Sequence, residues 1–269
     1  MERDSYEAVT RTPGSFEAAW QGIHLILAEG IPFFVKGTVL PPNRSEVEQF
    51  ESWAARIPGM DKPPLYAVLF DLRGRRDSAE KNRHIRALRL SADEVVEFAS
   101  RRREEYLKEM GEFCSRFTQP PGSRLFPCGA GVGGACVDAY GVVQLCLLLR
   151  HPDTVYDLKE GSLRHAIEEF FPKVRQFKAR NQEYVNRCAR CFLNGLCEQC
   201  PAQSWMEHGV LDTPVEYLCE ITHAQARHVG LLGESEMSWE VRDWRERFRR
   251  FSGSGASDQD YGSRKNASR

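Results

Sequence analysis

The first 120 residues alternate between two hydrophobic patterns. Apolar side chains recur at helical spacing after Ser15 and again after Ser45, whereas residues 33–40 and 65–72 form short, nearly continuous apolar runs. The first pattern is typical of amphipathic helices and the second of buried strands. The order helix, strand, helix, strand predicts an α/β arrangement in which parallel strands are joined by crossover helices. Residues 1–14 and 73–90 lack either pattern and are predicted to be loops or irregular.

Two Ser-x-x-Glu sequences, which begin at Ser45 and Ser91, read as capping boxes at helix N-termini. The second is predicted to open one long helix that ends near residue 117. The apolar stripe of this helix carries Val95, Phe98, Arg102, Tyr106, Met110, Phe113 and Phe117.

The sequence changes character at residues 120–122, Pro-Pro-Gly, after which short elements rich in Gly and Cys follow. Residues 135–137 and 142–147 flank a turn-forming sequence and predict a β-hairpin. Helices are predicted at 162–177, 214–231 and 239–251. We therefore expect four segments: an α/β domain at 1–120, a small Cys-rich α+β domain at 121–232, a C-terminal helix at 233–252 and a disordered tail at 253–269.

Composition excludes several classes of function. The chain has 269 residues with 37 basic and 38 acidic side chains, a net charge of −1, so we expect neither nucleic acid nor a membrane as a partner. No run approaches the ~20 apolar residues that span a bilayer. The first residues do not resemble a secretory signal, so a cytoplasmic location is expected. In that reducing compartment, nine cysteines predict metal ligands or catalytic thiols before disulfides.

Eight of the nine cysteines fall between residues 128 and 219, and four of them form the run Cys-x2-Cys-x5-Cys-x2-Cys-Pro at 188–201. Eight thiolates make two sets of four, the ligand count of two [4Fe–4S] clusters, and a Cys-Pro ending is typical of bacterial ferredoxin runs. Zinc is the competing metal. A zinc ribbon, however, usually has ~15–20 residues between its two Cys-x2-Cys pairs, whereas this run has five. The ninth, Cys114, lies on the apolar stripe of the long helix and is predicted to be a buried structural thiol.

The whole cysteine pattern resembles the SPASM domain of radical SAM maturases over about residues 126–222. The matching pieces are Cys128-x12-Gly141-x4-Cys146, the central run and Cys219. One departure is that two residues, not the usual three, precede the last cysteine of the run. The resemblance implies two auxiliary clusters that pass electrons or hold the domain together. Auxiliary cluster I would use Cys128, Cys136, Cys146 and Cys200, and auxiliary cluster II would use Cys188, Cys191, Cys197 and Cys219.

Radical SAM enzymes also carry Cys-x3-Cys-x2-Cys near the start of a partial (β/α)6 barrel, and this sequence lacks that motif. Residues 1–117 resemble the later half of such a barrel, in that the sequence Thr-Pro-Gly-Ser-Phe at 12–16 is followed by a helix, a strand and Asn43. A full barrel needs ~200 residues or more, so only part of one is expected. The expectation is the C-terminal portion of a radical SAM/SPASM protein that does not cleave S-adenosylmethionine alone. A partner polypeptide would supply the first barrel half, with S-adenosylmethionine and a third [4Fe–4S] cluster.

The function that the resemblance implies is an iron–sulfur component of a maturase that modifies a peptide or protein and receives electrons from a donor. A stand-alone iron–sulfur protein and a zinc-binding module are the alternatives. Lys36, Thr38, Asp71 and Arg73 lie at or near strand ends, which face the active site in barrel enzymes, and are weak candidates for contacting cofactor or substrate. Ordinary strand polarity or surface charge is the favoured explanation for them, and no histidine is assigned a role.

Overall fold

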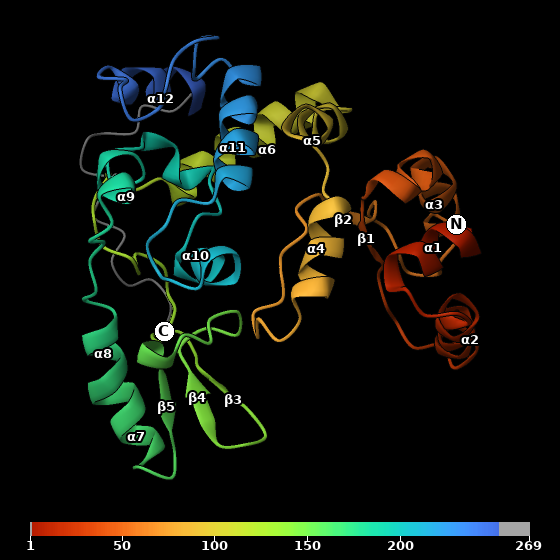
Figure 1. Ribbon diagram of the computed structural model, residues 1–269. Coiled ribbons are helices and arrows are strands. Elements are labelled where there is room, and N and C mark those ends of the chain that lie inside the picture. The colour runs from red at the N-terminus through yellow and green to blue at the C-terminus, as the bar shows by residue number, and fades with distance from the viewer. Residues whose placement is uncertain (1, 253–269) are drawn as a thin grey trace. The chain divides into compact units, whose positions relative to one another are not determined.

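The computed structural model describes residues 2–252, and the chain divides into two compact units (Figure 1). The first unit comprises the described residues up to Asp71 together with Ser78–Ser91. The second comprises Leu72–Asp77 and the described residues from Ala92 onward. The boundary predicted near residue 120 therefore falls inside the second unit, because helix α5 (Ala92–Ala99) packs on helix α11 (Glu216–His228). The predicted disordered tail at 253–269 lies outside the described residues.

The first unit is built around two short parallel strands. Strand β1 pairs with β2 so that Lys36 lies opposite Leu65 and Thr38 opposite Ala67. Helix α3 lies in the connection between them, as the order of hydrophobic patterns predicted. The elements of this unit are α1 (Arg3–Thr10), α2 (Ser15–Ala28), β1 (Lys36–Thr38), the 3-10 helix η1 (Pro41–Glu46), α3 (Val47–Ala54), β2 (Leu65–Ala67) and α4 (Ala79–Ala87).

Two segments that were predicted to be loops are helical. Helix α1 occupies most of residues 1–14, and its Tyr6 ring packs edge-on against Phe16, with the ring centres 5.7 Å apart. Helix α4 lies within residues 73–90 and begins at Ser78, whose Oγ accepts a hydrogen bond of 3.2 Å from the Lys81 N–H. Both helices are short and rich in charge, so each offers too few apolar positions for a helical period to be recognised.

The first predicted capping box does not begin its helix, whereas Ser91 directly precedes α5 as expected. Ser45 lies inside η1, which starts earlier because Pro41 and Pro42 suit a first helical turn. Asn43 stabilises the N-terminus of η1, since its Oδ1 accepts the Leu40 N–H at 2.8 Å. The long helix predicted after Ser91 is divided into α5 and α6 (Arg103–Phe117), with Arg102 in a non-helical conformation between them.

The second unit contains a three-stranded antiparallel sheet in the order β3-β4-β5. Strands β3 (Cys136–Val137) and β4 (Val142–Gln144) form the predicted hairpin, in which Cys136 lies opposite Gln144. The Asp138 carboxylate stabilises its turn by accepting the backbone N–H of Tyr140 at 2.9 Å. Strand β5 (Val155–Asp157) pairs with β4 and was not predicted.

The other elements of the second unit are short helices. The helix predicted at 162–177 consists of a helical turn, a π-helical turn and a second helical turn, and Pro172 removes one backbone donor from the last of these. No helix within residues 2–252 is long and apolar enough to cross a membrane. In chain order the elements are η2 (Pro152–Thr154), α7 (Leu163–His165), η3 (Ala166–Phe170), α8 (Phe171–Val174), α9 (Gln182–Asn186), η4 (Phe192–Gly195), α10 (Pro201–His208), α11 and α12 (Trp244–Ser252).

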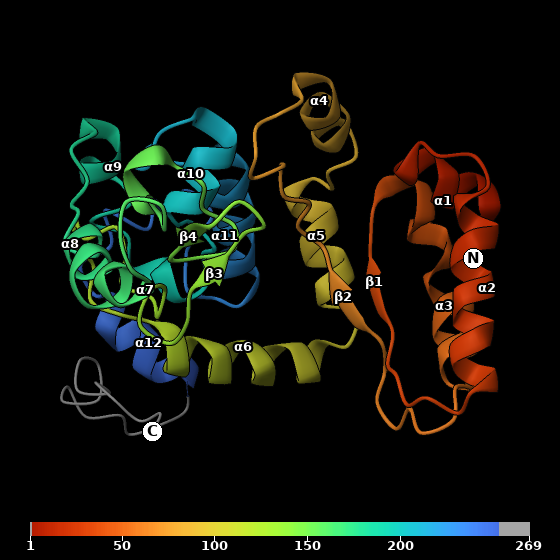
Figure 2. The same cartoon turned by 90° about the horizontal axis from the view of Figure 1, so that it is seen from below.

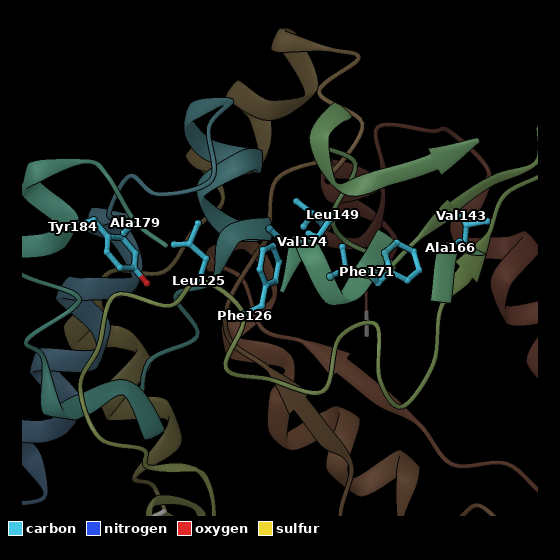
Figure 3. Close-up of a cluster of buried hydrophobic side chains, with 11 residues drawn as sticks. Leu125, Phe126, Val143, Leu149, Ala166, Phe171, Val174, Ala179 and Tyr184 are labelled. Carbon is cyan, nitrogen blue, oxygen red and sulfur yellow. The ribbon is translucent and has the colours of Figure 1, made fainter. Parts of the chain in front are cut away.

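One hydrophobic cluster of the second unit joins the sheet to the chain around it (Figure 3). Phe171 is fully buried and packs with Val143 and Leu149 from the hairpin side. Leu125 extends the cluster through a backbone hydrogen bond of 3.0 Å from its N–H to Phe177 O. Tyr184, 8% exposed, lies at the far end, and Cys146, Cys188 and Cys200 pack against the cluster.

A second cluster lies where α6 and α12 run side by side (Figure 2). Phe192 and Leu193 from η4 enter it and are fully buried. Cys114 from α6 is also fully buried, and burial raises the pKa of its thiol to about 12. Cys114 is therefore a protonated packing residue at neutral pH, as its place on the apolar stripe predicted.

Candidate metal centre

Tight turns hold the segment from Cys188 to Cys200. Helix α9 ends just before Cys188, whose carbonyl accepts the Cys191 N–H at 3.3 Å. After the single turn of η4, the Cys197 N–H donates to Leu193 O at 2.9 Å. Because Leu193 is anchored in the second hydrophobic cluster, these turns fix the backbone that carries the thiols.

Gly195 allows this segment to approach the end of α6 closely. A Cβ atom at Gly195 would lie 2.7 Å from the Thr118 backbone N and 2.8 Å from its Cα, which is too close for any side chain. Asn194 and Gln119 strengthen the same contact with two hydrogen bonds of 2.7 and 3.0 Å. The turn between Cys191 and Cys197 therefore requires a glycine because of space.

Replacing Gly195 with alanine is expected to destabilise the protein by at least about 1–3 kcal/mol, the usual cost of forcing atoms into a packed region. Urea unfolding of the fully reduced chain measures the loss. Gly122→Ala is the control, because a Cβ there meets nothing within 4 Å. Equal unfolding midpoints for the two variants would contradict the steric role of Gly195.

Four thiols, Cys188, Cys191, Cys197 and Cys219, line one cavity. The first three come from the turns just described and the fourth from α11. The cavity has a volume of about 30 Å³ and is partly open to solvent. As they stand, the described residues contain no group of three or more His, Cys, Asp or Glu that could hold a single metal ion.

Burial and mutual repulsion both favour the protonated form of these four thiols. Burial raises the pKa of each, that of Cys197 to about 12, and negative charge on one thiolate further raises the pKa of the others. A raised pKa means that the thiols keep their protons at neutral pH unless a cation lies between them. Metal binding at this cavity would therefore release protons, because the thiolate is the metal ligand.

Polar groups from distant parts of the sequence contact these sulfurs. Arg187 donates from Nη2 to Cys219 Sγ at 3.4 Å, and Ser238 Oγ lies 3.0 Å from Cys191 Sγ. His223 accepts the Ser238 N–H at Nε2, so its proton is on Nδ1, which lies 2.8 Å from Cys219 O and 3.5 Å from Cys219 Sγ. Burial lowers the pKa of His223, which favours the neutral ring.

The set of groups around the cavity suits a thiolate-bound, sulfide-containing metal cluster. The residues that line it include four thiols and no carboxylate, a set that selects soft metals. Arg187 also lines it, and its Nε–H is buried without an acceptor among the described residues. A buried donor without a partner costs free energy, and an acceptor sulfur inside the cavity would satisfy it.

A second thiol group forms around Cys200, which precedes α10. The backbone N–H groups of Ala202 and Gln203 hydrogen-bond to its sulfur, and Cys146 and Cys128 lie close enough for their charges to raise its pKa. Burial is the largest cause, and the pKa of Cys200 rises to about 11. Cys200 therefore joins two cysteines from the hairpin region, although Cys197 is only three residues away.

Cys128 and Cys136 lie on the hairpin side of the second unit. Arg175 anchors the Cys128 loop by donating from Nη1 to Cys128 O at 2.7 Å. Cys136 lies opposite Gln144 across the hairpin, and Cys146 follows Gln144 by two residues, just beyond the end of β4.

Tyr184 lies near thiols of both groups. Its phenol is buried, which raises its pKa, and charges on Cys188, Cys197 and Cys200 raise it further. Thiols of both groups therefore approach the same side chain.

The other candidates named from the sequence are Lys36, Thr38, Asp71 and Arg73, and the first three belong to a different unit from the thiols. Lys36 and Thr38 are exposed on β1, and Asp71 is half-buried at the end of the first unit. Arg73 belongs to the second unit and pairs with Asp77 through hydrogen bonds of 2.9 and 3.0 Å. None of the four lines the thiol cavity.

Sequence reasoning missed several residues that surround the cavity. The spacing of His223, four residues after Cys219 in a predicted helix, is a signal that could have placed it beside that thiol. Arg187 precedes Cys188 directly, but adjacency in sequence does not indicate contact with a thiol 32 residues later. Ser238 and Trp239 gave no signal at all.

Comparison of the chain with protein-family models, with curated proteins and with solved structures finds no match. The chemistry of the two thiol groups is therefore the basis for assigning a function.

Proposed function

We propose that the chain is an iron–sulfur protein that holds two [4Fe–4S] clusters. One would be bound by Cys188, Cys191, Cys197 and Cys219, which line a common cavity. The other would be bound by Cys128, Cys136, Cys146 and Cys200. The observation that carries the proposal is that Cys197 lines this cavity whereas Cys200, three residues later, does not and instead has Cys146 and Cys128 as charged neighbours.

A [4Fe–4S] cluster, when bound, supplies one-electron redox chemistry. The residues of this chain would hold it by four thiolates, leaving no iron open to substrate, and would shield it with buried side chains such as Phe192 and Tyr184. Electron transfer or docking of a substrate suits such closed sites better than direct chemistry on a substrate.

The cysteine spacing supports a more specific proposal, a component of a radical SAM/SPASM maturase that modifies a peptide or protein. In this proposal S-adenosylmethionine and its own cluster are bound by a partner polypeptide, and an electron donor reduces the clusters. The first unit supports a partner, because Leu25, Ile31, Phe34 and Leu65 are 54–73% exposed around its parallel strands. Parallel sheets are usually covered on both faces, and apolar exposure of this kind marks interaction surfaces.

Anaerobic reconstitution with iron and sulfide is expected to load about eight irons and about eight sulfides per chain, as two four-iron clusters require. The sample should turn brown and show the cluster signals of Mössbauer spectroscopy. Protein alkylated with iodoacetamide before reconstitution is the control and should bind almost no iron. A colourless product whose only stoichiometric metal is zinc would contradict the proposal and favour a zinc-binding module.

A further inference from the structure

The guanidinium of Arg187 lines the thiol cavity and is largely shielded from water. Its side chain is 19% exposed, and its Nη2 donates to Cys219 Sγ at 3.4 Å. The guanidinium also stacks over the Trp239 ring, 4.9 Å from the ring centre. A guanidinium remains charged at all ordinary pH values, so the positive charge beside this sulfur is permanent.

Two carboxylates partly balance this charge from the solvent side. Glu216 accepts hydrogen bonds of 2.6 and 2.9 Å from the two Nη atoms of Arg187, and Glu183 accepts one of 2.7 Å from Nη1. Both glutamates are more than half exposed, whereas Arg187 is not. Water screens the exposed carboxylates, which weakens their effect on the sulfur relative to that of the less exposed Arg187.

The second thiol group is surrounded differently. The hydrogen bonds to Cys200 Sγ come from the backbone N–H groups of Ala202 and Gln203. Arg175, the arginine beside this group, donates to the carbonyl oxygen of Cys128 rather than to a sulfur. A charged donor thus acts on a ligand sulfur of the Cys219 group, whereas neutral donors act on Cys200.

We propose that Arg187 is a positioning residue that raises the reduction potential of the cluster held by Cys188, Cys191, Cys197 and Cys219 above that of the other cluster. This rests on the proposed function. Reduction adds one negative charge to a cluster, and a charged hydrogen bond to a ligand sulfur stabilises the reduced form. The first electron that the protein accepts, from a one-electron donor such as dithionite, therefore resides at the Arg187 cluster, with no proton moved and no bond formed or broken.

Opposite charge changes at one ion pair test this inference. In anaerobic redox titrations of the reconstituted full chain, followed by electron paramagnetic resonance, Arg187→Gln is expected to lower the higher midpoint potential and Glu216→Gln to raise it. The Arg187→Gln shift should be at least tenfold in the reduction equilibrium, about 59 mV for one electron. The lower midpoint potential should stay unchanged in both variants.

Arg190→Gln is the matched control, because it removes the same charge from an exposed residue beside Cys191 and should leave both midpoints close to wild type. Shifts of the same sign in Arg187→Gln and Glu216→Gln, or equal shifts of both midpoints, would show a merely structural role. If Arg187→Gln does not retain its iron, an unchanged midpoint in Glu216→Gln overturns the inference. Wild-type protein that binds no iron refutes the proposed function instead.

Discussion

Replacing Cys197 with alanine is expected to remove about half of the iron from the reconstituted protein, about four of eight atoms, and to leave the rest bound. Cys197 lines the cavity with Cys188, Cys191 and Cys219, so its loss should empty that site. Cys200→Ala should also halve the iron content, but from the other site, because Cys200 lies with Cys128 and Cys146. Iron and sulfide analysis with Mössbauer spectroscopy measures both outcomes.

Double variants separate this assignment from a general weakening of the protein. Cys188→Ala combined with Cys197→Ala should lose no more iron than either change alone, whereas Cys197→Ala combined with Cys200→Ala should lose nearly all of it. Cys114→Ala is the control for removal of a thiol, since Cys114 is buried on α6, does not line the cavity and should not affect iron content. Equal iron in Cys197→Ala and wild type would refute the assignment of Cys197.

Replacing Phe192 with alanine is expected to destabilise the protein by about 3–5 kcal/mol, the usual range for a large buried side chain. Phe192 is 0% exposed and lies one residue after Cys191. Its ring stacks on Trp244 at 6.1 Å and meets Phe248 edge-on at 6.3 Å. The free energy of unfolding of a domain is typically only about 5–15 kcal/mol, so the variant should lose much of its stability.

Urea unfolding of the reduced, metal-free chain, followed by tryptophan fluorescence, measures this change. Phe113→Ala is a suitable comparison, because Phe113 is 43% exposed and packs mainly on its neighbour Phe117. Its expected cost is about 1 kcal/mol or less, as for most exposed positions. If the two variants unfold at the same urea concentration, Phe192 does not anchor the cysteine segment.

The parts of the fold that could be predicted are those set by local pattern. The parallel pairing of β1 with β2 followed from two apolar runs separated by a helical pattern, and the hairpin of β3 and β4 from a turn between apolar segments. Helix α4 could not be predicted, because its sequence is mostly charged and its start depends on one Ser78 hydrogen bond. The break between α5 and α6 was missed because the apolar stripe continues through it.

The thiols of the candidate site could be predicted, whereas their surroundings could not. Cysteine spacing alone favours soft-metal ligands, since thiolates are the ligands that soft metals prefer. Arg187 and Ser238 reach thiols that are 32 and 47 residues away, so only tertiary packing brings them together. The groups that tune a metal site are for this reason the hardest to find from sequence.

Cys197 and Cys200 belong to different thiol groups, yet two residues separate them. Three residues of extended chain span at most about 10–11 Å, so this covalent tether limits how far apart the two thiol groups can move. In the proposed iron–sulfur protein, electron transfer between the two clusters would therefore need no docking event.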